Sequence, residues 1–353
     1  MIARRILTGA GAVLLAAVLA ACGGTASPGA GTAADGGSGL DPQPLPQKEK
    51  VVVGTSARLE TFLAMMFAQE NGEFAKENLE VDIQIVPPND STILLTQGQL
   101  DVVATGTSAV NFNAMAAGAP LRGVFPGSVP LPESKEGLWL RKEVLGADGQ
   151  FQPADLKGKR IATLGGNVGV NQAYMWKMLK EQDPTFQLSD LKFERIAAAD
   201  MSSAVTGGAV DGGVMISPSW EPLVDDGCCV NVGYSPPYGS SFYAFGPALL
   251  DERPAVGQAF VRALARTQKE YLQGNFHADP AKAAETAKVL QSTVERVQRE
   301  PAPTFSTSWP MPTEMADISQ DYLFQVGGIL SYEQPLTSEQ IYDMRFIDNL
   351  NAG

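Results

Sequence analysis

The sequence predicts an α/β protein built from two doubly wound lobes that are joined by two crossings of the chain. From residue 48 onward, short apolar segments alternate with segments of helical periodicity, an order typical of parallel sheets with helices on both faces. The alternation occurs twice, before and after a Pro- and Gly-rich stretch at 124–132. The 306 residues from 48 to 353 are enough for two separate hydrophobic cores.

The first lobe is predicted from its β-α alternation. The apolar run 51–53 is typical of a buried parallel strand, and a helical segment follows at about 59–71. Apolar and charged side chains alternate over 79–85, which indicates a half-buried strand, and two prolines end it. A helix at 91–97, a strand at 101–104 and a helix at 109–117 complete a βαβαβ order, which predicts a doubly wound parallel sheet.

The second lobe repeats this pattern. Strands are expected at 137–140, 159–164, 192–196 and 213–216, with helices at 153–156, from about 170 to 180, and from a cap at Asp200 to about 207. A second crossing near 230–237 returns the chain to the first lobe, where helices are expected over 251–274, from Pro280, and after the capping box of Thr337 and Gln340. The predicted lobes are 48–126 with 234–353, and 127–233.

The N-terminus has the layout of an export signal. Arg4 and Arg5 precede an uncharged apolar run at 6–19, which is too short for a stable membrane span. The ending Leu-Ala-Ala-Cys22 resembles the bacterial lipobox, and the resemblance implies cleavage after residue 21 and acylation of Cys22; a plain signal peptide is the alternative. Residues 22–47 are rich in small residues and proline, which predicts a flexible spacer behind the lipid anchor.

The charge excludes some classes of partner. Removal of residues 1–21 leaves 24 basic and 39 acidic side chains, a net charge of −15. Nucleic acids and anionic lipid surfaces favour basic faces, so we expect no nucleic-acid partner and contact with the membrane through the lipid anchor only.

The reactive side chains give little support to an enzyme. Besides Cys22 the sequence contains Cys228 and Cys229, which we expect to be free or rarely bridged because a bond between neighbours is strained, and which do not form a metal site. The single histidine, His277, is expected at the surface before a helix. Dinucleotide, nucleophile-elbow and metal-ligand motifs are absent from the sequence, so we predict no catalytic residue, no cofactor and no metal.

A ligand site is predicted at the carboxyl ends of the strands, where ligands collect in open α/β sheets. Gly-, Ser- and Thr-rich turns that open into helices expose backbone N–H groups and favour an anion in each lobe, although each is also compatible with an ordinary turn. Aromatic candidates are pocket walls or core, and Arg58 and Glu60 either pair with ligand charges or face solvent. The candidate residues are Ser56, Arg58, Glu60, Phe62, Gly106, Thr107, Ser108, Gly166, Asn167, Val168, Ser219, Trp220, Glu221 and Tyr243.

Four sequence blocks recur in the order of a known family. They are Lys-Val-Val-Val-Gly from Lys50, Gln-Gly-Gln-Leu-Asp-Val from Gln97, Asp-Leu-Lys-Gly-Lys-Arg-Ile-Ala from Asp155 and Gly-Ala-Val-Asp-Gly from Gly208. Over about 50–350 the chain resembles the substrate-binding proteins of nitrate, sulfonate, taurine and thiamine-precursor ABC importers. The resemblance implies a type II periplasmic-binding fold with two hinge crossings and closure around a ligand.

The resemblance also implies a function and partners. We expect an extracytoplasmic, membrane-anchored, monomeric protein that binds a small organic solute, anionic or zwitterionic, and delivers it to an ABC permease and its ATPase. The candidate pocket side chains do not match one substrate class. A thiamine-precursor (pyrimidine) binding or biosynthetic protein and a solute sensor are the alternatives; the Cys-rich motif with histidine of the catalytic relatives is present here only as a Cys228–Cys229 fragment.

Overall fold

The structure is a computed structural model that describes residues 39–131, 133–164, 166–216 and 219–351. The chain divides into Met1–Gly36 and Gly37–Gly353, and all described residues belong to the second unit. The predicted signal peptide, Cys22 and most of the predicted spacer lie outside the described residues. None of the helices in the described ranges combines the length and apolar character that a membrane span requires.

The first lobe is built on a five-stranded sheet with the order β2-β1-β3-β10-β4. Its strands are β1 (Glu49–Thr55), β2 (Leu79–Ile85), β3 (Val102–Gly106), β4 (Arg122–Pro126) and β10 (Ser241–Phe245). β1 pairs in parallel with β2 and β3, whereas β10 is antiparallel to β3 and β4. The predicted parallel pairing of the βαβαβ strands is confirmed for β1, β2 and β3, whereas β10 is an additional strand that enters from the other lobe and was not predicted.

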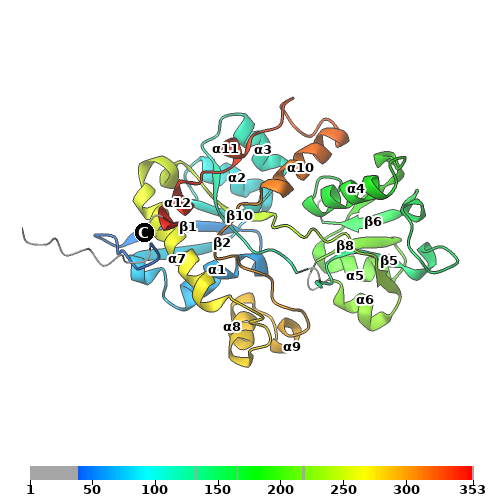
Figure 1. Cartoon of the computed structure of the whole chain (residues 1–353), viewed down its shortest axis with the longest axis horizontal. Coiled ribbons are helices and arrows are strands. Elements are labelled where there is room, and N and C mark those ends of the chain that lie inside the picture. The colour runs from blue at the N-terminus through cyan, green and yellow to red at the C-terminus, as the bar shows by residue number, and fades with distance from the viewer. Residues whose placement is uncertain (1–38, 132, 165, 217–218, 352–353) are drawn as a thin grey trace, which may run out of the picture. The chain divides into compact units, whose positions relative to one another are not determined.

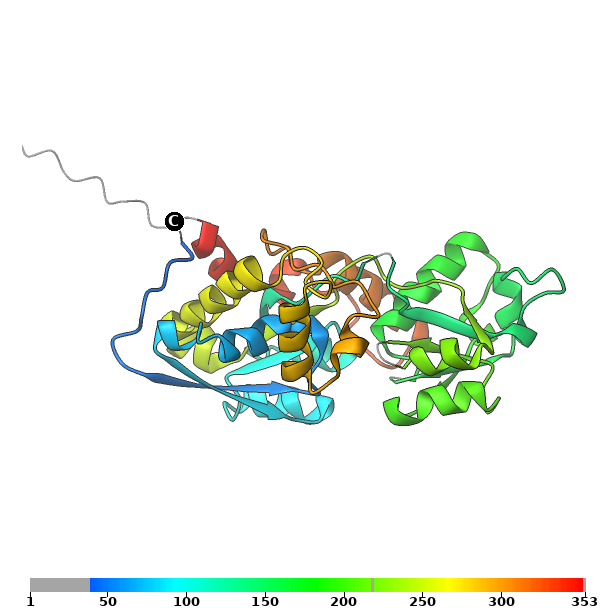
Figure 2. The same ribbon diagram turned by 90° about the horizontal axis from the view of Figure 1, so that it is seen from below.

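The second lobe repeats this arrangement with the order β7-β6-β8-β5-β9. Its strands are β5 (Gly137–Arg141), β6 (Arg160–Thr163), β7 (Lys192–Arg195), β8 (Gly212–Met215) and β9 (Cys229–Asn231). β6 is parallel to β7 and β8, and β5 is antiparallel to β8 and β9. The chain passes from one lobe to the other after β4 and returns before β10 (Figure 1 and Figure 2). This is the periplasmic-binding architecture that the sequence predicted.

Helices cover the sheets of both lobes (Figure 1). In the first lobe they are α1 (Leu63–Glu70), α2 (Pro88–Thr96), α3 (Ala109–Ala116), α7 (Pro254–Tyr271), α8 (Pro280–Leu290), α9 (Val294–Val297), α10 (Thr313–Val326), α11 (Ser338–Ile341) and α12 (Arg345–Asn351). In the second they are α4 (Val170–Gln182), α5 (Ala198–Thr206) and α6 (Glu221–Asp226). Short 3₁₀ or π turns are η1 (Glu60–Phe62), η2 (Ala75–Glu77), η3 (Lys142–Val144), η4 (Pro153–Leu156), η5 (Leu188–Asp190) and η6 (Ala248–Glu252).

Local capping explains where several helices begin. The Asp279 side chain accepts hydrogen bonds from two backbone N–H groups at the start of α8, and the predicted capping box of Thr337 and Gln340 begins α11. The predicted cap at Asp200 is wrong, because α5 begins earlier, at an Ala197 N-cap, and places Asp200 in its first turn.

The chain crossings depend on glycine. At Gly137 (φ +124°) an added Cβ would lie 2.4 Å from the carbonyl oxygen of Gly233, so the two crossings meet where no side chain fits. At Gly127 an added Cβ would lie 2.3 Å from Oγ of Ser241 and 2.8 Å from Oγ1 of Thr61. The first crossing therefore lies directly against β10 and η1.

Residues 40–45 are part of the folded first lobe, although the sequence predicted a flexible spacer there. The Leu40 side chain is buried in the core of this lobe, and Arg266 Nη1 donates to its carbonyl oxygen at 2.9 Å. The backbone N–H of Gln43 donates to Glu77 Oε2 at 3.2 Å, and that of Leu45 donates to the Glu77 carbonyl oxygen at 3.1 Å. Two apolar side chains, Leu40 and Leu45, pack on the core, and the hydrogen bonds come from residues far along the chain, which explains why the composition of this segment did not reveal it.

A buried ion network lies beneath this segment. Arg262 and Arg266 of α7 form ion pairs with Glu73 and Glu77, whose side chains are both 0% exposed. Burial disfavours an ionised carboxylate, yet hydrogen bonds from Lys76 and Arg266 hold the pKa of Glu73 below its ordinary value. The network joins α7 to the turn before β2 and so fixes the back of the first lobe.

Cys228 and Cys229 form a disulfide at the beginning of β9. The sequence favoured thiols that are free or rarely bridged and left the bridge open; the structure has the bridged form. Within the described ranges, no three His, Cys, Asp or Glu side chains lie where they could hold a metal ion together.

Candidate functional site

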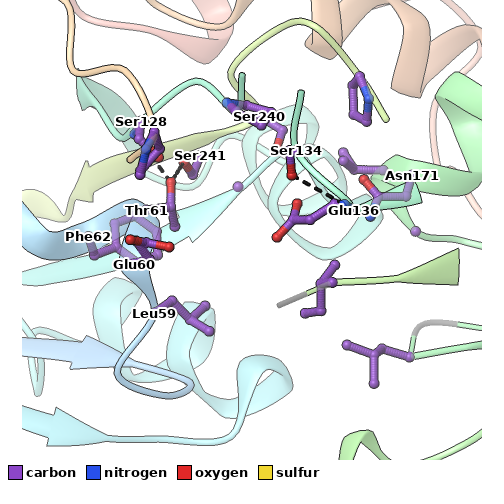
Figure 3. A pocket seen from close by; sticks show the side chains of 18 of the residues that line it. Leu59, Glu60, Thr61, Phe62, Ser128, Ser134, Glu136, Asn171, Ser240 and Ser241 are labelled. Atoms are coloured by element: carbon purple, nitrogen blue, oxygen red, sulfur yellow. Dashed lines mark hydrogen bonds between the residues drawn. The ribbon is translucent and has the colours of Figure 1, made fainter. Parts of the chain in front are cut away.

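A cavity of about 460 Å³ lies at the carboxyl ends of strands from both lobes (Figure 3). Its volume falls in the range of pockets that enclose small organic molecules. The first lobe contributes Ser56, Leu59, Glu60, Thr61, Phe62, Ser91, Ala104, Thr105 and Gly106, and the second Thr163, Leu164, Gly169, Val170, Asn171, Gln172, Val214 and Ile216. The crossings, the start of β10 and the loop after α9 contribute Ser128, Pro130, Leu131, Ser134, Glu136, Pro236, Tyr238, Ser240, Ser241, Glu300, Pro301 and Pro303.

The first-lobe wall is held together by short-range polar contacts. The hydroxyl groups of Thr61 and Ser241 are hydrogen-bonded to each other, and the Ser128 backbone N–H lies 3.2 Å from both Oγ1 and the carbonyl oxygen of Thr61 (Figure 3). These contacts join the turn after β1 to the first crossing and to β10. A small ligand can therefore meet three separate chain segments at this wall.

The second-lobe wall is the beginning of α4. Gly169 is its N-cap, and the next three residues also line the cavity. Gln172 Nε2 donates at 2.7 Å to the Gly166 carbonyl oxygen, which also accepts from Thr163 Oγ1 at 2.7 Å. These bonds fold the loop after β6 back on the helix, so that the first turn of α4 faces the cavity.

The lobes contact each other on both sides of the cavity. On one side, α4 packs against α10 (Figure 1), and Tyr174 packs against Tyr238 with ring centroids 6.3 Å apart. On the other, Glu221 of α6 forms ion pairs with Arg299 at 3.3 Å and Arg296 at 3.5 Å. These contacts hold the two walls close to each other.

His277 is a buried link behind the cavity. Its side chain is 3% exposed, Nε2 lies 2.5 Å from Glu60 Oε1, and Nδ1 lies 2.9 Å from the carbonyl oxygen of Glu300. Burial opposes protonation, but the Glu60 carboxylate and the Glu300 carbonyl outweigh it and raise the pKa of His277. The predicted surface position is therefore wrong, because these two partners and the Phe276 ring enclose the imidazole.

Glu300 is a lining carboxyl group in a buried environment. Burial raises its pKa to about 7, and the carboxylates of Glu136, Glu60 and Glu221 add to this rise, while the nearby Trp220 side chain opposes it. Its Oε1 is buried, and no hydrogen-bond partner for it occurs in the described part of the chain. A ligand group that donates a hydrogen bond here would satisfy this oxygen.

Four of the fourteen candidate ligand-binding residues line this cavity: Ser56, Glu60, Phe62 and Gly106. Two others, Gly166 and Asn167, line a separate cavity of about 300 Å³ with Arg195. Glu60 faces the cavity while paired with His277, an arrangement that the sequence did not indicate.

Three first-lobe candidates have structural roles outside the lining. Arg58 Nη1 donates to the Val289 carbonyl oxygen at 3.0 Å. The backbone N–H of Thr107 donates to the Ser240 carbonyl oxygen at 3.0 Å, and the Ser108 side chain caps α3. The predicted anion seat at this turn is therefore displaced from the cavity, and the helix start that faces the cavity is that of α4.

The two large aromatic candidates are core residues. Tyr243 is fully buried, packs against Phe62 with ring centroids 5.3 Å apart, and directs its hydroxyl group to the Phe62 carbonyl oxygen. Trp220 stacks on Trp139 at 6.4 Å and lies under the Lys135 ammonium group. Neither ring lines the cavity.

The remaining three candidates make contacts that stabilise the fold and do not line the cavity. The Ser219 carbonyl oxygen accepts a hydrogen bond from Ser202, Val168 packs against the core of the first lobe, and Glu221 holds the arginines of the opposite lobe.

Sequence reasoning missed the lining that comes from the crossings and from the loop after α9. The Pro- and Gly-rich composition at 124–132 indicated a crossing but not a wall of the site. Glu300 lies in a Glu-Pro-Ala-Pro segment that carries no recognisable ligand motif. The position of Glu300 in the cavity lining is known only from the structure, in which the loop after α9 returns to the cavity.

Solved structures of low sequence identity share this fold. The alkanesulfonate-binding protein SsuA from Xanthomonas axonopodis pv. citri, bound to MOPS, matches with a TM-score of 0.60 and 17% identity, covering 84% of this chain and 99% of that one. The periplasmic aliphatic sulphonate binding protein SsuA from Escherichia coli gives 0.57 and 19%, covering 84% and 98%. The nitrate-binding protein NrtA from Synechocystis PCC 6803 gives 0.61 and 13%, covering 86% and 89%.

No curated protein sequence matches the chain. The family model described as NMT1/THI5 like matches residues 60–275, which is more than half of the chain and includes strands of both lobes. The chain therefore belongs to the NMT1/THI5-like family.

Proposed function

We propose that this protein is the extracytoplasmic solute-binding component of an ABC importer. The observation that carries the proposal is a cavity of metabolite size whose walls come from both lobes and both crossings. A solute in that cavity contacts every part that moves when two lobes close about a hinge, so its binding energy favours the closed form. A permease can then distinguish the loaded protein from the empty one.

The family and the related structures support a binding role and not a catalytic one. The structures with the same fold are named as sulfonate- and nitrate-binding proteins. We infer that Ser56, Glu60, Phe62 and Gly106 contact the solute, together with the lining of the crossings and of α4. The lobe boundaries near residues 127 and 233 are the proposed hinges.

A thermal-shift screen of small metabolites on the purified protein tests this function. Binding to the native state alone raises the unfolding midpoint by mass action, by about 2.7 kcal/mol of stability at a hundredfold excess over Kd. We expect at least one class of small solute to raise the midpoint, and a substitution that fills the cavity to abolish the effect. A broad panel without any stabilising solute would contradict the proposal.

The membrane attachment is proposed from the sequence. We infer that residues 1–21 are removed and that acylated Cys22 holds the protein at the outer face of the cell membrane, as a monomer beside its permease. The full-length protein should incorporate labelled palmitate and fractionate with membranes, whereas Cys22→Ala should be unlabelled and enter the soluble fraction. Equal labelling of the two proteins would contradict the anchor.

A further inference from the structure

The ionisable side chains of the cavity lining have one sign of charge. Glu60, Glu136 and Glu300 line the cavity, and its described lining includes no Lys, Arg or His. The undescribed residues within the core are Pro132, Gly165, Ser217 and Pro218, which are uncharged by sequence. An anionic solute would therefore meet carboxyl groups without a cationic side chain in the lining to pair with it.

The cationic residues that neighbour the lining in the sequence have other partners. Arg296 and Arg299 pair with Glu221, Arg58 donates to a backbone carbonyl group, and the Lys135 ammonium group lies 4.8 Å from the centre of the Trp220 ring. His277 is paired with Glu60 behind the lining. Within the described part of the chain, no donor lies in hydrogen-bond geometry at the buried Glu300 Oε1, although the Trp220 side chain is near enough to lower the pKa of Glu300.

We propose that the cavity takes a small solute that carries a protonated amine, and that the ammonium group lies at Glu300 and Glu136. This inference rests on the proposed solute-binding function and names the chemical class of the solute. An ammonium N–H group supplies the donor that Glu300 Oε1 lacks and offsets the repulsion between neighbouring carboxylates through charge-assisted hydrogen bonds.

The rest of the lining favours an ammonium group that carries N–H over a quaternary one. Quaternary ammonium groups are recognised by several aromatic faces, whereas the aromatic lining here is limited, in the described residues, to Phe62 and Tyr238. Hydroxyl groups surround the same space, from Ser128, Ser134, Ser240 and Ser241 (Figure 3). Hydroxyl oxygens accept hydrogen bonds from N–H groups, which a quaternary nitrogen does not have.

Matched series of solutes test the charge preference. Linear and cyclic primary amines would be compared with the alcohols and carboxylates of the same carbon skeletons, by thermal shift and by saturation-transfer NMR at pH 8. We expect some of the amines to bind and their carboxylate analogues to bind at least tenfold more weakly. Binding of alcohols or carboxylates without binding of amines would overturn the inference and leave the proposed function standing; binding of none of them would contradict both.

Glu300→Gln tests the contribution of the carboxylate charge to binding while it preserves the size of the side chain and the shape of the cavity. Loss of a charge-assisted hydrogen bond should weaken amine binding by roughly 10- to 100-fold, while any binding of the alcohol analogue should be nearly unchanged. Glu194→Gln, which removes an equal charge from exposed β7, is the matched control and should bind amines like the wild type. Equal amine affinities of Glu300→Gln and the control would overturn the placement of the ammonium group.

Discussion

The buried ion network of the first lobe allows a quantitative prediction for Glu77→Gln. The substitution preserves the size of the side chain and removes a carboxylate that is 0% exposed. That carboxylate accepts from Arg262 Nη2 at 2.7 Å and from the backbone N–H of Gln43 at 3.2 Å, and it is also paired with Arg266. Arg266 keeps its contact with Glu73, whereas Arg262 loses its carboxylate.

Removing one partner of a buried ion pair costs about 3–5 kcal/mol, because the remaining charge is buried without compensation. For a core of this length, each kcal/mol lowers the unfolding midpoint by about 2 °C, so we expect a decrease of about 6–10 °C. Differential scanning calorimetry at pH 7 measures it.

Glu80→Gln is the control for this prediction, because its side chain is 61% exposed and faces Lys48 at 3.7 Å. An exposed pair contributes about 0–1 kcal/mol, which corresponds to a decrease of about 2 °C or less. If Glu77→Gln lowers the midpoint no more than this control, the network does not stabilise the lobe as the geometry indicates.

Three further predictions concern the lobes, the pH dependence and the disulfide. Glu221→Gln should weaken solute affinity through faster release, because Glu221 pairs with Arg299 of the opposite lobe. The arginine is half exposed, so the loss should be no more than about fivefold. An unchanged release rate in stopped-flow measurements would contradict a role of this pair in closure. The unfolding midpoint of the unliganded protein should decrease as the pH is raised from 5 to 8. His277 and Glu300 both have raised pKa values, so the folded state binds more protons than the unfolded state in this range and loses stability as they dissociate. An equal decrease in Glu300→Gln would exclude the contribution of that carboxyl group. Cys228 and Cys229 should not react with Ellman's reagent until reductant is added, and reaction of both thiols in untreated protein would rule out the disulfide.

The sequence was most informative where apolar periodicity sets the structure. The alternation over Leu79–Ile85 gave β2 with its observed bounds, and the pattern after residue 159 gave β6 and the loop that begins α4. Burial alternates with the side-chain pattern at the start of β2, although Ile85 at its end is 60% exposed, and β6 is a short run of buried side chains after one exposed residue; such local patterns can be recognised without distant contacts.

The elements that depend on distant partners were not found. β10 was not expected as a strand beside β3, because its pairing requires the return of the chain from the other lobe. The docking of Leu40 depends on a hydrogen bond to its carbonyl oxygen from the side chain of Arg266, more than two hundred residues away. Neither contact leaves a periodic signal in the sequence.

A cavity lies where the sequence placed the candidate site, but the predicted residues make up only part of its lining. The carboxyl ends of the strands do line the cavity, as Ser56 and Gly106 show. The bulky candidates were misplaced, because a large aromatic side chain beside such a loop is equally suited to the core, where Trp220 and Tyr243 are buried. Glu300 could be recognised only after the loop after α9 was seen to return to the cavity.

Solute capture in the cavity between the lobes is tested most directly by calorimetric titration of three proteins with a solute that the thermal-shift screen selects. Asn171 lies in the first turn of α4 and lines the cavity (Figure 3), so Asn171→Trp should fill the space and Asn171→Ala should leave it open. We predict one solute per chain for the wild type and Asn171→Ala, and no heat of binding for Asn171→Trp with a nearly unchanged unfolding midpoint. Binding of the solute to Asn171→Trp with wild-type affinity would contradict the assignment of this cavity as the binding site.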